Sequence, residues 1–154
     1  MGMIGGVLLL SLLASADAPL WQAPAAALAG LWFADDQQGQ EDCDSFKQAR
    51  DRWQNEGSLL VGALWIDGER LHRMAEFGEG DIHQVAGSVE VSPTQWQLDV
   101  VEGVDTLPDR EHDMRFPLQL TLSDGVLVWQ EQLLPPLTRR WRRCSDTPSQ
   151  GSIN

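Results

Sequence analysis

The chain has 154 residues and is strongly acidic, with 23 Asp and Glu against 11 Lys and Arg and a formal net charge of −12. A surface with this excess of negative charge repels a polyanion, so the composition excludes nucleic acid as a partner. The length corresponds to one domain, and at this size a hydrophobic core can hold the fold without metal ions or several disulfides.

The first sixteen residues predict an export signal. An apolar run from Met3 to Leu13 leads into Ala14-Ser-Ala16, small residues at the spacing that signal peptidase recognises. The run is about eleven residues long, whereas a transmembrane helix needs about 20. We therefore expect residues 1–16 to be removed, leaving a periplasmic or secreted protein without an integral membrane segment. Because no Lys or Arg precedes the run, a buried N-terminal strand or helix is the alternative.

Residues 17–29 are rich in Ala and Pro and have no consistent periodicity, which indicates a tether that leads into the fold. The single folded domain is expected to span residues 30–145. It is followed by a tail, residues 146–154, whose Ser, Thr, Pro and Gln content predicts disorder.

The folded part begins with a predicted short strand, Gly30–Ala34, and an acidic, Gln-rich loop at residues 35–42. Residues 45–55 predict the helix of the domain. Ser45 would cap its N-terminus, with a glutamine three residues later completing a capping-box pattern. Apolar residues at helical spacing would then share one face of this helix.

Seven further strands are predicted, at residues 58–67, 69–77, 81–91, 94–102, 114–123, 126–133 and 137–144. Asp67-Gly68 and Asp124-Gly125 are strong hairpin signals. Apolar and polar residues alternate within several strands, which places one face in a core and the other in solvent. Because eight such strands close naturally on themselves, we predict a mainly β fold: an eight-stranded antiparallel up-and-down barrel with one short helix after the first strand.

Cys43 and Cys144 are the two cysteines of the chain. In an oxidising compartment an even count predicts a disulfide, and the pattern of a reactive thiol, such as C-x-x-C, is absent. A simple meander places the two residues at opposite rims. A disulfide then requires residues 35–42 to run back about 20 Å, which eight extended residues can just span at about 3.3 Å each. The alternative is a different strand order.

The start of the first strand, Gly30-Leu31-Trp32, resembles the Gly-x-Trp sequence that opens the first strand of lipocalins and intracellular fatty-acid-binding proteins, the calycin group. The Arg-rich last strand, Arg139-Arg-Trp-Arg-Arg143, is also similar to theirs. The resemblance implies a calycin-like barrel in which Trp32 packs against a basic residue of the closing strand, either Arg140 or Arg142. It also implies a cavity for a hydrophobic small molecule.

No catalytic signature is present: the sequence lacks the nucleophile, zinc, phosphate-loop and dinucleotide motifs. We therefore predict a protein that is not an enzyme, with no catalytic residue, no metal site and no cofactor. His72 and His83 lie in neighbouring predicted strands and could approach as a metal or acid–base pair, although ordinary histidines are the simpler interpretation. The cluster of four arginines either binds a carboxylate or phosphate head group or pairs with the protein's own acids, such as Glu131.

The leading hypothesis is an exported, non-enzymatic barrel that binds an apolar or amphipathic small molecule, such as a lipid or fatty acid. Four inward aromatic side chains would line the cavity, and one of two arginines would meet the head group: Trp65, Trp96, Phe116, Trp129, Arg140 and Arg142. The alternative is a secreted or periplasmic protein-interaction module with a filled core, either an inhibitor or an envelope assembly factor. Its contact would be Trp21 in the tether or a rim loop.

Overall fold

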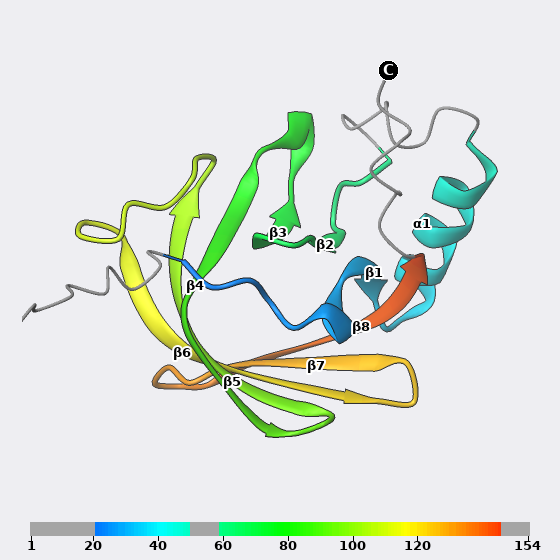
Figure 1. The fold of residues 1–154 in the computed structure, drawn as a ribbon. Helices are drawn as coiled ribbons and strands as arrows, with labels where there is room; N and C mark the ends of the chain where they lie inside the picture. Colours follow the sequence, from blue (N-terminus) through cyan, green and yellow to red (C-terminus); the bar gives the residue numbers. More distant parts are fainter. Residues whose placement is uncertain (1–20, 50–58, 146–154) are drawn as a thin grey trace, which may run out of the picture.

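The structure is a computed structural model that describes residues 21–49 and 59–145; the predicted signal peptide and tail lie outside these residues. Eight antiparallel strands form a closed barrel in which each strand pairs with its neighbour in sequence and β1 pairs with β8 (Figure 1). The predicted fold is confirmed. The strands are β1 (Gly30–Ala34), β2 (Leu64–Ile66), β3 (Arg70–Met74), β4 (Gly80–Ser92), β5 (Gln95–Val104), β6 (Met114–Ser123), β7 (Val126–Glu131) and β8 (Leu137–Ser145).

The helix α1 (Gln37–Gln48) begins before the predicted position. Its N-cap is Asp36, whose carboxylate accepts a hydrogen bond from the Gly39 backbone N–H at 2.8 Å. Ser45 therefore lies inside the helix, and the prediction of a loop at residues 35–42 is wrong. The glutamines and acids of this stretch form the exposed face: three glutamine side chains donate to carboxylates four residues later at 2.9–3.1 Å. Residues 50–55 of the predicted helix lie outside the described residues.

The helix turns back along the outside of β1. Gly39 packs so closely on the backbone of Ala34 that a Cβ at this position would overlap it. The return brings Cys43 to the end of β8, where it forms the predicted disulfide with Cys144, with 5.7 Å between the two Cα atoms. A simple meander was expected to require the chain after the first strand to run back about 20 Å to form this disulfide. Because β1 has only five residues, a return of that length is unnecessary. Phe46 of the helix is fully buried in a second, smaller core on this outer face.

The main core fills the interior of the barrel. Its buried residues are Leu28, Trp32, Leu64, Ile66, Leu71, Val85, Trp96, Leu98, Val100, Phe116, Leu118, Leu120, Leu127, Trp129 and Trp141. The strand alternation read from the sequence explains most of this set, because every second residue of β5 and β6 points inward. A helix long and apolar enough to cross a membrane does not occur in the described part of the chain.

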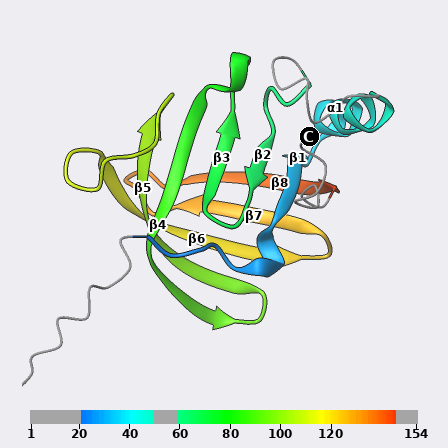
Figure 2. The same cartoon turned by 45° about the horizontal axis from the view of Figure 1, so that its top comes forward.

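The segment before β1 packs against the barrel from Trp21 onward, so it is not a free tether over this part. The backbone N–H of Gln22 donates to Val85 O at 2.7 Å. The 3-10 turn η1 (Ala26–Leu28) then buries Leu28 completely in the main core. Figure 2 shows the segment running from β4 to the start of β1. It closes this end of the barrel, which we call the closed end.

Arg143 of β8 holds the closed end together. Its guanidinium lies 4.3 Å from the centroid of the Trp32 ring, and it donates to two backbone carbonyls of the segment before β1 at 2.5 Å each. The contact between Trp32 and a basic residue of the last strand is therefore present, but Arg143 makes it in place of Arg140 or Arg142. The reason is the strand register, which pairs Trp32 with Arg143.

Candidate binding site

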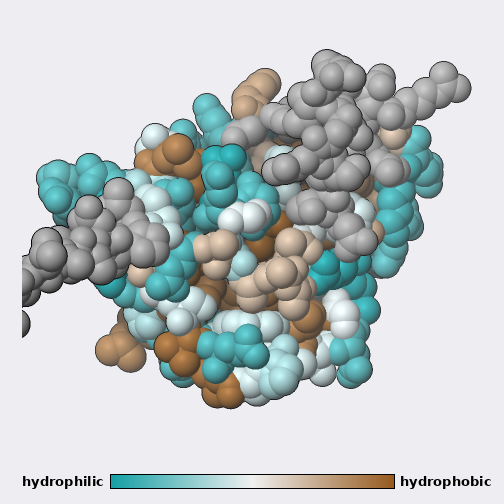
Figure 3. All heavy atoms as spheres, in the orientation of Figure 1, coloured by the Kyte–Doolittle hydropathy of each residue, from teal (hydrophilic) through white to brown (hydrophobic). Residues whose placement is uncertain are grey.

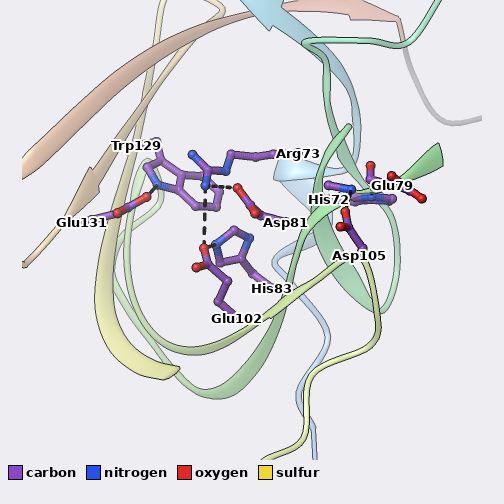
Figure 4. Close-up of polar contacts among 10 residues, drawn as sticks. His72, Arg73, Glu79, Asp81, His83, Glu102, Asp105, Trp129 and Glu131 are labelled. Atoms are coloured by element: carbon purple, nitrogen blue, oxygen red, sulfur yellow. Dashed lines mark hydrogen bonds and ion pairs between the residues drawn. The ribbon is translucent and has the colours of Figure 1, made fainter. Parts of the chain in front are cut away.

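The other end of the barrel, which we call the open end, holds a cluster of charged side chains (Figure 4). Arg73 of β3 lies between Asp81 of β4, with which it forms a close ion pair, and Glu102 of β5, whose Oε2 is 3.7 Å from its Nη2. His83 is fully buried, and its Nε2 lies 2.7 Å from Glu102 Oε2. The strand register creates this cluster, because Arg73 is paired with Asp81 and His83 with Glu102 across neighbouring strands.

Aromatic side chains form the floor under this cluster. The His83 ring meets Trp129 and Phe116 edge-on, with centroid distances of 5.1 and 5.8 Å. The Trp129 indole N–H donates to Glu131 Oε1 at 3.0 Å, in a contact that is itself buried. The charged groups thus stand on an apolar surface of low polarisability, where electrostatic interactions are stronger than in water.

The close contact with His83 lowers the pKa of Glu102, and the positive charges of Arg73 and Arg139 lower it further, whereas burial acts in the opposite direction. A carboxyl group whose pKa is lower in the folded protein stabilises the fold above its ordinary pKa. That contribution is lost as the pH falls through the folded-state value.

Glu102→Gln is therefore expected to lower the free energy of unfolding by about 2 kcal/mol at neutral pH, since it removes a hydrogen bond to a charged group. The difference from the unmodified protein should shrink as the pH falls below 4.5, the ordinary value of this carboxyl. Urea unfolding at a series of pH values measures both quantities. The exposed Glu69→Gln is the control, and a Glu102→Gln difference that does not change with pH would contradict the expectation.

Arg139 of β8 is a cation that lacks a hydrogen bond or ion pair within the described residues, and its Nε is buried. Burial lowers the pKa of this guanidinium, and the positive charge of Arg73 lowers it further, whereas Glu131 and other acids of the cluster raise it. The buried indole N–H of Trp141, two residues along the same face of β8, also has no acceptor among the described residues. Both groups can donate to an anion.

Arg139 and Trp141 both line a pocket of about 450 Å³ at the open end. Its wall includes Arg73, Met74, Asp81, Asp105, Arg139 and Trp141. Arg73 on one side is already paired with Asp81, whereas Arg139 on β8 is not. The pocket therefore places the Arg139 guanidinium, whose Nε has no hydrogen-bond partner among the described residues, beside an indole ring, an arrangement that suits an anionic group attached to an apolar body.

The structure separates the aromatic residues that were predicted to line a cavity. Trp96, Phe116 and Trp129 point into the barrel, but at most 3% of each is exposed, and they pack in the main core beneath the pocket. Trp65 is on the outer face of β2 and packs against the smaller core under α1, so the prediction that it points inward is wrong. Leu64 and Ile66, its neighbours on this strand, occupy the inner face instead.

The two arginines that were predicted to meet a head group lie on the outer face of β8. Arg140 and Arg142 are exposed, and their Nη2 atoms lie 3.2 and 2.9 Å from the carboxylate of Asp35. One interpretation of the four arginines was that they pair with the protein's own acids. Arg140 and Arg142 do so, but the acid is Asp35 and not Glu131.

Sequence reasoning did not single out Arg73, Glu102 or, as a ligand-binding residue, Arg139. One signal was available: Arg139 shares a strand face with Trp141, and a strand places its large aromatic residue on the core side more often than on the solvent side. Within residues 21–49 and 59–145, no group of three or more His, Cys, Asp and Glu could hold a metal ion.

The chain was also compared with known families, proteins and structures. No protein-family model, no curated protein and no solved structure matches the chain.

Proposed function

We propose that this protein is an exported, non-enzymatic β-barrel that binds an amphipathic small molecule at its open end, with an anionic head group on Arg139. The observation that carries the proposal is the partly buried Arg139 side chain, which lines a pocket and whose Nε has no hydrogen-bond partner among the described residues. A buried N–H donor without an acceptor costs free energy. A carboxylate or phosphate from the ligand would supply charge-assisted hydrogen bonds and remove this cost.

The size of the pocket limits the ligand. Its volume of about 450 Å³ lies within the range of about 300–1,000 Å³ that is usual for small-molecule sites. The main core below it is tightly buried, so the ligand would lie in the mouth of the barrel with its apolar part against Trp141. A compact lipid-like or fatty-acid-like molecule fits this description.

Two further observations support the proposal. The disulfide between Cys43 and Cys144 is a bond that persists in oxidising compartments, which favours export together with the predicted signal peptide. The closed barrel of eight antiparallel strands and the contact of Trp32 with Arg143 resemble the calycin arrangement. This likeness of fold supports ligand binding only by analogy.

The test compares two arginines that are neighbours in sequence and face opposite sides of β8. Native mass spectrometry of protein exported from its host should detect a bound small molecule, and dansyl-labelled undecanoic acid serves as a defined amphipathic carboxylate. We expect Arg139→Gln to weaken binding of this probe by about 10- to 100-fold, the effect of losing a charge-assisted hydrogen bond. Arg140→Gln should bind like the unmodified protein. Equal losses in the two variants, or no binding by the unmodified protein, would refute the proposal.

A further inference from the structure

Large apolar side chains that are exposed in the described residues gather at the open end of the barrel. Of the nine, seven lie in or beside the connections at this end: Val61, Phe77, Val104, Leu107, Met114, Leu134 and Leu137. The other two, Val89 and Val91, lie on β4 near its closed-end turn. The tight turns of the closed end, by contrast, are made of polar residues, Gly and Pro. Exposed apolar residues that gather on one side of a molecule mark an interaction surface.

Three of these residues lie within the β3–β4, β5–β6 and β7–β8 connections of the open end, and we call them the apolar rim: Phe77, Leu107 and Leu134. Their exposed fractions are 82%, 54% and 100%. Phe77 has a φ of 58°, a left-handed conformation that bulky residues rarely adopt, and this conformation presents its ring to solvent. In Figure 3 an apolar side chain stands out from the upper edge of the molecule, where Figure 1 places the β3–β4 connection.

Two of the three connections that carry the rim are fixed to one another. The Asp105 carboxylate accepts a hydrogen bond from the Gly80 backbone N–H at 2.8 Å, and the Asp105 N–H donates to Gly80 O at the same distance. These two bonds tie the β5–β6 connection to the β3–β4 connection. Around Phe77, the Ala75 N–H donates to Glu79 O at 2.8 Å. A rim that is already ordered loses less conformational entropy when a partner binds.

The charge around the rim selects the kind of partner. Residues 75–79 and 105–113 contain six acids against one arginine and one histidine; the acids are Glu76, Glu79, Asp105, Asp109, Glu111 and Asp113. Such a surface repels an anionic bilayer and attracts a positively charged protein. Residues 132–136, which carry Leu134, have no charged side chain, so this side of the rim is an uncharged contact area.

We infer that the apolar rim is a docking surface for a basic protein. The partner would place apolar side chains on Phe77, Leu107 and Leu134 and direct Lys and Arg side chains toward the acids of the same connections. The inference goes beyond the proposed function, because it rests on the connections of the open end and not on Arg139.

The experiment begins with a photo-crosslinking amino acid at position 77 in the full chain, expressed in its host. A captured protein is then purified, and its affinity is measured at low and high salt. The rim variant is Phe77→Ser with Leu107→Ser and Leu134→Ser. The matched control is Val89→Ser with Val91→Ser, which removes exposed apolar residues at the opposite end. All five positions are exposed, and thermal unfolding verifies that both variants fold.

We expect the captured protein to be basic, to bind the unmodified protein and the control variant equally, and to bind the rim variant at least tenfold more weakly, since apolar anchors dominate interface energies. Binding should also weaken as salt is raised. A partner that is not basic, one that binds all three proteins alike, or no captured protein would overturn the inference.

Two further measurements identify other occupants, and either positive result would replace the basic protein. Flotation with vesicles of phosphatidylcholine, alone or mixed with phosphatidylglycerol, would reveal a lipid surface if the rim variant lost binding. Sedimentation velocity would reveal a second copy of the chain if the rim variant alone became monomeric. The rim variant should keep its affinity for dansyl-labelled undecanoic acid, and Arg139→Gln should keep its affinity for the partner, so the two proposals fail separately.

Discussion

Replacing both cysteines, Cys43→Ala with Cys144→Ala, is expected to lower the free energy of unfolding by about 4–5 kcal/mol. The two residues are separated by 101 positions, so the disulfide removes a large loop-closure entropy from the unfolded chain. Both are also nearly buried and contribute to the smaller core beside Phe46. Denaturant unfolding of the oxidised protein, the reduced protein and the double variant measures the effect.

The reduced protein and the double variant should unfold at nearly the same denaturant concentration, and a reductant should leave the variant unchanged. A loss below about 1 kcal/mol would contradict the expectation. It would mean that the unfolded chain already keeps α1 and β8 close together without the covalent bond.

Trp32→Ala is expected to lower the free energy of unfolding by about 3–5 kcal/mol, the usual loss for a large buried aromatic residue. Trp32 is completely buried, its indole N–H donates to Leu28 O at 3.0 Å, and its ring carries the Arg143 guanidinium. The substitution thus removes packing, a hydrogen bond and a cation–π contact at the closed end together. Denaturant unfolding measures the cost.

The control is Trp65→Ala, which changes the same residue type at a half-buried position outside the barrel. We expect it to cost clearly less than Trp32→Ala. A double-mutant cycle of Trp32→Ala with Arg143→Met should give a coupling energy of about 0.5–3 kcal/mol, as for residues in direct contact. Equal losses at the two tryptophans, or no coupling with Arg143, would show that the closed end does not depend on this contact.

The strands were predictable because their patterns are local. In β5 and β6 the alternation of apolar and polar residues fixes both the element and its buried face, and the Asp-Gly pairs mark two of the turns. The helix was predicted too late in the sequence. The residues of its first turns are nearly all polar and therefore indicate a loop. Their helical role depends on the Asp36 cap and on two tertiary anchors, Cys43 and Phe46.

The site was harder to predict than the fold. The sequence separates the last strand into two faces, one with Arg139 and Trp141 and the other with Arg140 and Arg142, but both faces carry arginine. Which face is inside depends on the pairing of β8 with β1 and β7, which no local pattern determines. The cluster of Arg73 and Glu102 likewise forms only when three strands come into register.

The pairing of the first strand with the last also determines when the barrel can form during synthesis. β1 obtains its partners from β2 and from β8, the final strand, and the closed end needs Arg143 to fix the segment before β1. Contacts across so much sequence form late, because the chain between them must first be ordered. A nascent chain therefore lacks a completed barrel until its C-terminal strand has been made. Under the proposed export, a barrel that cannot close before its last strand is made leaves the chain able to pass through a narrow translocation channel.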